Sequence, residues 1–322
     1  MFFKKKAPAD FTPVDVEKAK EATAADVVRF YSAARLSFDG IRIEAMGYEG
    51  PPMPLKAITE SISCGLAVDN GSNYVRVTQQ MLDRWGSDFD HMLIDTARRC
   101  LAQQWNMTFM SGLGMLNDEV IGPALWICPD VAQSLVKGTP IMVGVDRTHM
   151  LLMQEGDSQS IDWAARYCRT ALDGEEFVES VTPTRWDGNR WESLTWEGLG
   201  VGSDRAKAIT MRYDSRNYAR AKPALKQLYE TRDEYPIAAS FQMFADKDGK
   251  EFSSASIVDG QTESNIIPAT DYVIFVYSDG RASLMLPWEV ASAHCEFRAL
   301  GLSPQWYQVV TIPSHEQLSS LM

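Results

Sequence analysis

The residues best suited to acid–base or nucleophilic chemistry are few. The chain has four histidines, which are His91, His149, His294 and His315. His149 follows Asp146, Arg147 and Thr148 in a predicted turn, where a carboxylate, a hydroxyl and an imidazole could converge on an anion. A turn histidine with locally satisfied hydrogen bonds is the favoured interpretation, and Arg147 and His149 are kept as candidate binding residues.

Two other histidines lie in predicted helices. His294 precedes Cys295, but adjacent helical residues point about 100° apart, so a Cys/His nucleophile would need a distant partner. His91 and Asp95 share one helix face and could form a metal site or an acid/base pair. A solvated helix face is the favoured interpretation there, and the catalytic residues remain unknown.

The sequence offers no standard metal or cofactor motif. Its five cysteines, at 64, 100, 128, 168 and 295, form no C-x-x-C pair and are interpreted as buried thiols in a reducing compartment. The glycine-rich segments 111–115 and 198–202 lack the strand and helix context of a phosphate loop. Segment 246–251 has its glycine at the fourth position rather than the sixth, which indicates a hairpin turn and not a calcium loop. We therefore expect no metal and no cofactor.

An aromatic hairpin supplies the other candidate binding residues. Segment 182–196, TPTRWDGNRWESLTW, contains Trp186, Trp191 and Trp196 around a turn at Asp187-Gly188. A two- or four-residue loop would put the first two rings on one face, where they should stack, whereas a three-residue loop would separate them. Trp196 would point the other way and pack between two domains. Arg185 and Arg190 leave room for an acidic partner or a cation–π contact, although interdomain packing is favoured over a ligand platform.

Composition and charge restrict the partners. The 322-residue chain has a formal net charge of -12 and is 45% hydrophobic, which is typical of a globular protein. Nucleic acid is an unfavourable partner for so acidic a chain. No apolar stretch of about 18 residues predicts a membrane span, and Lys4-Lys5-Lys6 is not followed by the apolar core of a signal peptide. We expect a cytoplasmic protein of bacterial type.

The order of predicted elements favours an α+β fold of two lobes, each a mostly antiparallel sheet with helices packed on it. The predicted organisation is a flexible basic segment at 1–20, a first domain at 21–198 and a second at 205–322. Hairpins are predicted at 65–77, 139–153, 182–196, 237–260 and 271–288, and helices at 23–36, 78–86, 87–101, 129–138, 158–174, 218–233 and 289–301. Strands are predicted at 41–50, 124–128 and 208–214.

Several of these segments resemble a known family. The run LAVDNGSNYVRVTQQMLDRWGSDFDHMLIDTARRCL at 66–101 is similar to the core of the YtpQ-like bacterial proteins, a family without an assigned function. The segments ALWICPDVAQSLV, PIMVGVDRTHMLLM and TRWDGNRWESL fit its later strands and helix, so that the resemblance covers about residues 40–195. It implies a shared fold and no catalytic residue.

The sequence as a whole favours a non-enzymatic recognition protein that binds a protein partner or a small ligand between its two lobes. One alternative is a hydrolase that uses carboxylates with His149 or His294. A second alternative is an accessory or immunity-type subunit whose acidic surface masks a basic partner.

Overall fold

The computed structural model describes residues 22–48, 52–69, 74–174, 177–234, 237–258 and 265–322. The predicted basic segment 1–20 lies outside these ranges. Contacts between residues group the chain into two compact units, and each is discontinuous in sequence. The first comprises Met1–Tyr31, Gly50–Ser160 and Pro183–Ser193, and the second comprises Ser32–Glu49, Ile161–Thr182 and Leu194–Met322. Segment 205–322, which the sequence predicts as the second domain, lies wholly in the second unit, whereas the predicted first domain, 21–198, is divided between the two units.

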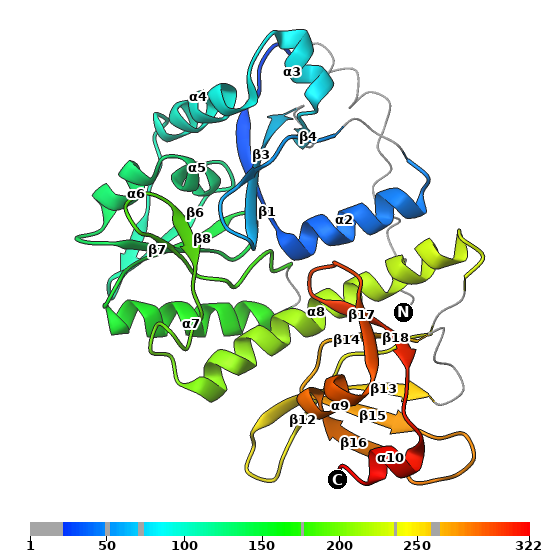
Figure 1. Ribbon diagram of the computed structural model, residues 1–322. Helices are drawn as coiled ribbons and strands as arrows, with labels where there is room; N and C mark the ends of the chain where they lie inside the picture. The colour runs from blue at the N-terminus through cyan, green and yellow to red at the C-terminus, as the bar shows by residue number, and fades with distance from the viewer. Residues whose placement is uncertain (1–21, 49–51, 70–73, 175–176, 235–236, 259–264) are drawn as a thin grey trace, which may run out of the picture. The chain divides into compact units, whose positions relative to one another are not determined.

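The first unit contains two sheets (Figure 1). One sheet has the order β1-β3-β2, with β4 also paired to β3. Its strands are β1 (Val27–Ser32), β2 (Lys56–Ala57), β3 (Ile62–Asp69) and β4 (Tyr74–Arg76). The other sheet has the order β10-β9-β7-β8-β6-β5, and every neighbouring pair in it is antiparallel. Its strands are β5 (Thr108–Met110), β6 (Leu113–Asn117), β7 (Pro140–Gly144), β8 (His149–Gln154), β9 (Thr184–Trp186) and β10 (Trp191–Ser193).

The helices of this unit are α3 (Gln79–Trp85), α4 (Phe89–Leu101), α5 (Ile121–Ile127) and α6 (Pro129–Leu135). Of these, α3 and α4 begin at side-chain caps and α6 begins at a proline. The Thr78 hydroxyl accepts a hydrogen bond from Met81 N at 3.3 Å, and Gly86 ends α3 in the left-handed region. The cap of α4 is Asp88, whose carboxylate accepts from His91 N.

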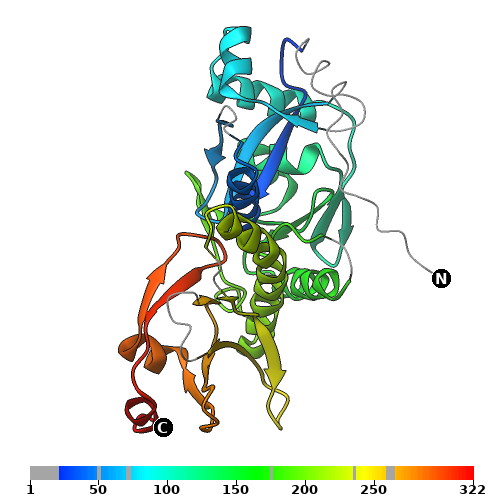
Figure 2. The same cartoon turned by 90° about the vertical axis from the view of Figure 1, so that its right-hand side faces the viewer.

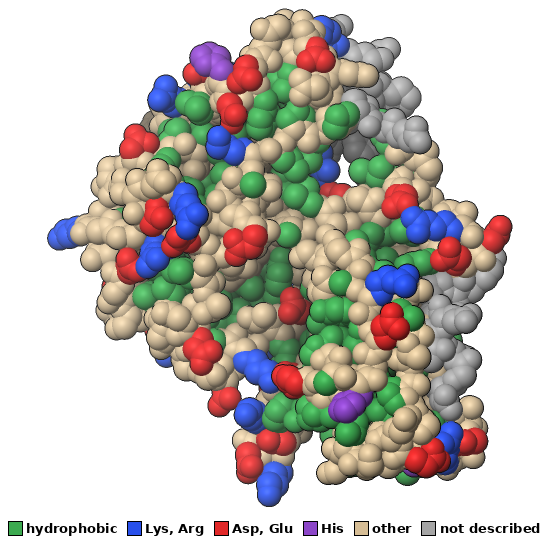
Figure 3. Space-filling model, in the orientation of Figure 1, with side chains coloured by type: hydrophobic (Ala, Val, Ile, Leu, Met, Phe, Trp, Pro, Cys, Tyr) green, Lys and Arg blue, Asp and Glu red, His purple; other side chains and the backbone are tan. Residues whose placement is uncertain are grey.

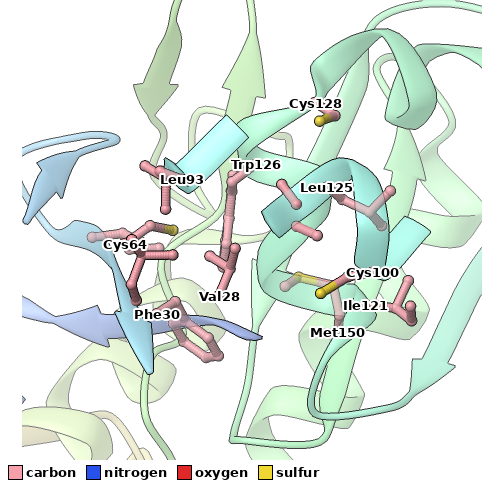
Figure 4. Packing of buried hydrophobic residues seen from close by; sticks show 14 of the residues in the cluster. Val28, Phe30, Cys64, Leu93, Cys100, Ile121, Leu125, Trp126, Cys128 and Met150 are labelled. Atoms are coloured by element: carbon pink, nitrogen blue, oxygen red, sulfur yellow. The ribbon is translucent and has the colours of Figure 1, made fainter. Parts of the chain in front are cut away.

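One hydrophobic core joins both sheets of the first unit to α3, α4 and α5. Trp126 of α5 lies at its centre and packs on Phe30 of β1 with ring centroids 5.1 Å apart (Figure 4). Gly144, at the end of β7, passes directly beneath these two rings. A Cβ atom on Gly144 would lie 2.6 Å from Trp126 and 2.8 Å from Phe30, so the close packing requires glycine.

The second unit is built on long helices and two mixed sheets (Figures 1 and 2). Its helices are α2 (Ala33–Ala45), α8 (Ser203–Glu230), α9 (Trp288–His294) and α10 (His315–Ser319), together with the larger part of α7 (Ser158–Asp173). The sheets have the orders β11-β14-β18-β17 and β12-β13-β15-β16. Their strands are β11 (Ile237–Ala238), β12 (Gln242–Ala245), β13 (Glu251–Val258), β14 (Asn265–Pro268), β15 (Tyr272–Val276), β16 (Leu284–Pro287), β17 (Glu296–Ala299) and β18 (Trp306–Thr311). The fold class is α+β, as predicted.

The predicted hairpins form. Antiparallel pairing joins β3 to β4, β7 to β8, β9 to β10, β12 to β13 and β15 to β16. The Asn70-Gly71 turn itself lies outside the described residues. Glycines with positive φ do occupy the turns at Gly188, Gly249 and Gly280.

Five predicted elements are wrong, and in each case an apolar run was assigned the wrong period. The predicted helix at 23–36 begins only at Ala33, because Val27–Ser32 is a strand buried on both faces. Segment 41–50 is not a strand, since Ile41 and Ala45 bury one side of α2. Segment 124–128 lies mostly in α5, a short helix that is buried on all sides.

The other two errors concern α8 and α9. Segment 208–214 lies inside α8, which is continuous from Ser203 to Glu230 with Pro223 in its interior. The predicted helix at 289–301 is helical only to His294, after which β17 follows. Among the described residues, no helix has both the length and the apolar character needed to cross a membrane.

Candidate functional site

The aromatic hairpin closes with a four-residue loop. Trp186 pairs with Trp191 across β9 and β10, and their ring centroids are 5.5 Å apart. The two indoles are thus on one face and in contact, as this register predicts, but their planes are inclined by 56° and do not stack. Trp191 is buried in the core of the first unit, and its indole N–H donates to the Trp126 carbonyl at 2.9 Å. The tryptophan pair is thus part of the core: Trp191 is buried and Trp186 is half-exposed.

The two arginines of the hairpin are engaged in ion pairs. Arg185 binds Glu155 at 2.7 Å and Glu192 at 3.0 Å, and Arg190 binds Glu192 at 3.0 Å. Hydrogen bonds from Arg185 and Arg190 hold the pKa of Glu192 below its usual range. The positive charges are therefore matched by Glu192 of the hairpin and by Glu155, which directly follows β8, and less of them is left for an acidic partner.

Trp196 belongs to the second unit, where it is buried. Its indole N–H donates to the Val181 carbonyl at 2.9 Å. The expectation that the three tryptophans join two domains stays a prediction.

Asp146, Thr148 and His149 converge in the turn between β7 and β8. Asp146 Oδ1 accepts from Thr148 N at 2.7 Å, Thr148 Oγ1 at 2.9 Å and His149 N at 2.9 Å, while Oδ2 lies 2.8 Å from His149 Nδ1. Burial alone would raise the pKa of Asp146, but these hydrogen bonds outweigh it and lower the pKa. A charged Asp146 favours the tautomer that carries its proton on Nδ1. Arg147 is exposed.

The sheet register separates these two groups of predicted residues. Arg185 lies opposite Ile141, near the beginning of β7, whereas His149 follows the turn at the end of β7. The hairpin loop and the Asp146–His149 turn are therefore at opposite ends of the same sheet. The structure does not assemble them into a single site.

The remaining candidates for chemistry are two histidines and the five cysteines. His91 Nε2 lies 3.1 Å from Asp95 Oδ2 on an exposed helix face, and His294 is exposed on α9. All five cysteines are buried and free, and burial raises the pKa of each thiol, to about 11 in Cys295. Within the described part of the chain, no group of three or more His, Cys, Asp or Glu side chains is arranged to hold a metal ion.

A pocket of about 560 Å³ lies in the second unit between α2, α8 and the loop after β17. Figures 1 and 2 show α2 alongside the C-terminal half of α8. Ile41, Leu225 and Leu228 form its floor and also belong to the core cluster of this unit. Leu300 and Leu302 line its loop side. The sequence analysis did not identify any of these residues.

Polar groups make up much of the pocket lining. Ser37 Oγ accepts a hydrogen bond from Ser303 N at 2.9 Å, which ties the loop to α2. Glu44 and Arg232, both partly exposed, form an ion pair between α2 and the residues that follow α8. Gly40 also lines the pocket, and a Cβ atom added there would meet no atom within 4 Å. The arrangement suits a molecule with an apolar body and a polar head group.

Comparison with known proteins finds no matching family model, no matching curated protein and no matching solved structure. The resemblance to the YtpQ-like family thus stays a prediction that depends on the residues quoted for it. On the face shown in Figure 3, Lys and Arg side chains are scattered among Asp and Glu side chains, so that no extended basic area is visible there.

Proposed function

We propose that the chain is a recognition protein that binds a small molecule with an apolar body in the pocket between α2 and α8. The supporting observation is the pocket itself, whose volume of about 560 Å³ lies within the range typical of small-molecule sites. Its floor is apolar, so that burial of a ligand's hydrocarbon surface supplies the driving force. Glu44 and Arg232 supply charges of both signs for the head group.

The proposal is tested by filling the pocket from Gly40. A Gly40→Trp side chain would project from a helical position into open space, and replacing a helical glycine does not weaken the helix. The probe is 1-anilinonaphthalene-8-sulfonate, whose fluorescence reports apolar sites. We expect saturable binding to the wild type and at least about a tenfold loss of affinity in Gly40→Trp, a loss of about 1.4 kcal/mol.

The matched control is Ile43→Trp, which adds an indole to an exposed position of the same helix that does not line the pocket. This variant should bind the dye as the wild type does. Equal affinity in Gly40→Trp and the wild type would contradict the proposal, as would a matching loss in both variants.

The His149 turn supports a second candidate function. A carboxylate held 2.8 Å from Nδ1 is the arrangement that orients a histidine acting as a general base in a hydrolase. If the chain has hydrolase activity, His149→Ala should abolish it with little change in the free energy of unfolding, and His294→Ala should retain it. Screening the purified protein against ester, amide and phosphoester model substrates measures this. Activity that is unchanged in His149→Ala would exclude this candidate.

A further inference from the structure

Arginine and phenylalanine side chains gather on a different side of α2, away from the pocket. The guanidinium carbon of Arg220, on α8, lies 4.1 Å from the centre of the Phe177 ring. The guanidinium carbon of Arg35, on α2, lies 5.5 Å from the centre of the same ring. Both guanidinium carbons therefore lie close to the same ring, and the distance between them is at most the sum of their two distances to its centre. Phe38 extends the cluster, since Arg42 and Arg220 both lie over its ring.

Arg220 is the unusual member of this cluster. It is half-buried, and none of the ion pairs or hydrogen bonds among the described residues involves it. A desolvated guanidinium normally has a carboxylate partner, because burying an unpaired charge is costly. By contrast, Arg35 has one, since its Nε donates to Asp39 at 2.9 Å. The aromatic contacts of Arg220 replace only part of its lost hydration.

Charges of both signs lie near Arg220, and that of Arg35 is matched by Asp39. Burial and the nearby Arg35 and Arg216 lower the pKa of Arg220, although Glu179 opposes them. Glu179 is buried and accepts hydrogen bonds from Ser32 N at 3.0 Å and Ser32 Oγ at 3.3 Å. An arginine remains protonated in such surroundings, so the positive charge of Arg220 persists at every physiological pH. In a chain with a net charge of -12, this local excess of arginine is distinctive.

We propose that Arg220 and Arg35, which converge on Phe177, form a binding site for a phosphate group. Guanidinium groups bind phosphate oxygens through paired N–H donors. The site's several arginines favour a dianion over a monoanion such as acetate. Phe177 and Phe38 hold the guanidinium planes in place, which reduces the entropy lost on binding. This site is separate from the apolar pocket and does not depend on the proposed function.

Binding of inorganic phosphate to the full chain is measured by isothermal titration calorimetry at constant ionic strength. We expect phosphate to bind the wild type, and to bind Arg220→Gln at least about tenfold more weakly, as expected for the loss of charge-assisted hydrogen bonds. Arg220→Lys keeps the charge but loses the paired donors, so its affinity should be intermediate. Lys226→Gln removes a cation from an exposed position on the same helix and should bind as the wild type does.

Several results would overturn the proposal. These are the absence of phosphate binding by the wild type, equal affinity in Arg220→Gln, or acetate binding as tight as phosphate. Glu175 and Glu176 precede Phe177 in the sequence and lie outside the described residues. Phosphate binding that appears only in the double variant Glu175→Gln/Glu176→Gln would show that the chain's own carboxylates occupy the arginine cluster. This result, too, would overturn the proposal. Circular dichroism of each variant confirms that it is folded.

Discussion

At the scale of single residues, Trp191 shows how an aromatic side chain with a polar group is accommodated in a core. Its ring packs against Trp186, and its N–H is satisfied by the Trp126 carbonyl. Both features follow from the four-residue loop, which fixes the register of the hairpin. The sequence predicted contact between the two rings for this loop length, but it could not choose among loop lengths.

Replacing Trp191 tests its role in the core. Trp191→Ala should lower the free energy of unfolding by about 3–5 kcal/mol, since it removes a buried indole and its hydrogen bond. Trp186→Ala should cost clearly less, because that ring is half-exposed. Urea denaturation followed by circular dichroism measures both. Equal losses in the two variants would contradict this description of the hairpin.

Asp214 of α8 makes stability depend on pH. Burial raises the pKa of this carboxyl from 3.8 to about 7. Between these values the folded chain retains a proton that the unfolded chain has lost, so the contribution of Asp214 to stability falls as pH rises through this window. The fall cannot exceed about 1.4 kcal/mol per pH unit.

In Asp214→Asn, the free energy of unfolding should not show this decrease with rising pH. The stability of the variant relative to the wild type should therefore increase as pH rises from about 4 to about 7, and then become constant. Asp204→Asn, at an exposed position of the same helix, serves as the control. Thermal or urea unfolding at a series of pH values provides the measurement. Parallel pH profiles for the wild type and Asp214→Asn would show that Asp214 titrates normally.

At the scale of elements, the hairpins and capped helices could be predicted because their signals are local. Asp-Gly turns fix a hairpin, and Thr78 and Gly86 mark both ends of α3. Short apolar runs carry no such signal. Val27–Ser32 and 124–128 are both buried on all sides, so that neither has a period that separates strand from helix.

Gly144 shows a constraint between elements that no local pattern reveals. Gly144→Ala would place a methyl group within 3 Å of both Trp126 and Phe30, and buried rings cannot move freely. We expect a loss of about 1–3 kcal/mol in the free energy of unfolding. Gly138→Ala is the control, because its nearest neighbours would lie 3.5 Å away, an ordinary contact. Gly144→Ala with wild-type stability would contradict the described packing of β7 against α5.

At the scale of the whole molecule, the sequence predicted the α+β class and the His149 turn, but neither the pocket between α2 and α8 nor the Arg220 cluster. Leu225 and Leu228 have helical spacing that indicates core, and they are indeed buried, so nothing in the pattern marks them as the floor of a pocket. The Arg220 cluster depends on α2, α8 and Phe177 meeting in space, which sequence spacing does not encode. The predicted cytoplasmic location, the lack of nucleic-acid binding and the cleft between lobes stay predictions.

The central claim is that a small apolar ligand binds between α2 and α8. The most direct measurement is methyl NMR of the full chain with labelled Ile and Leu, titrated with decanoate and, separately, with decylamine. We predict chemical-shift changes concentrated at the methyl groups of Leu36, Ile41, Leu225, Leu228, Leu300 and Leu302. Changes confined to methyl groups of the first unit, or no saturable change with either ligand, would contradict the claim.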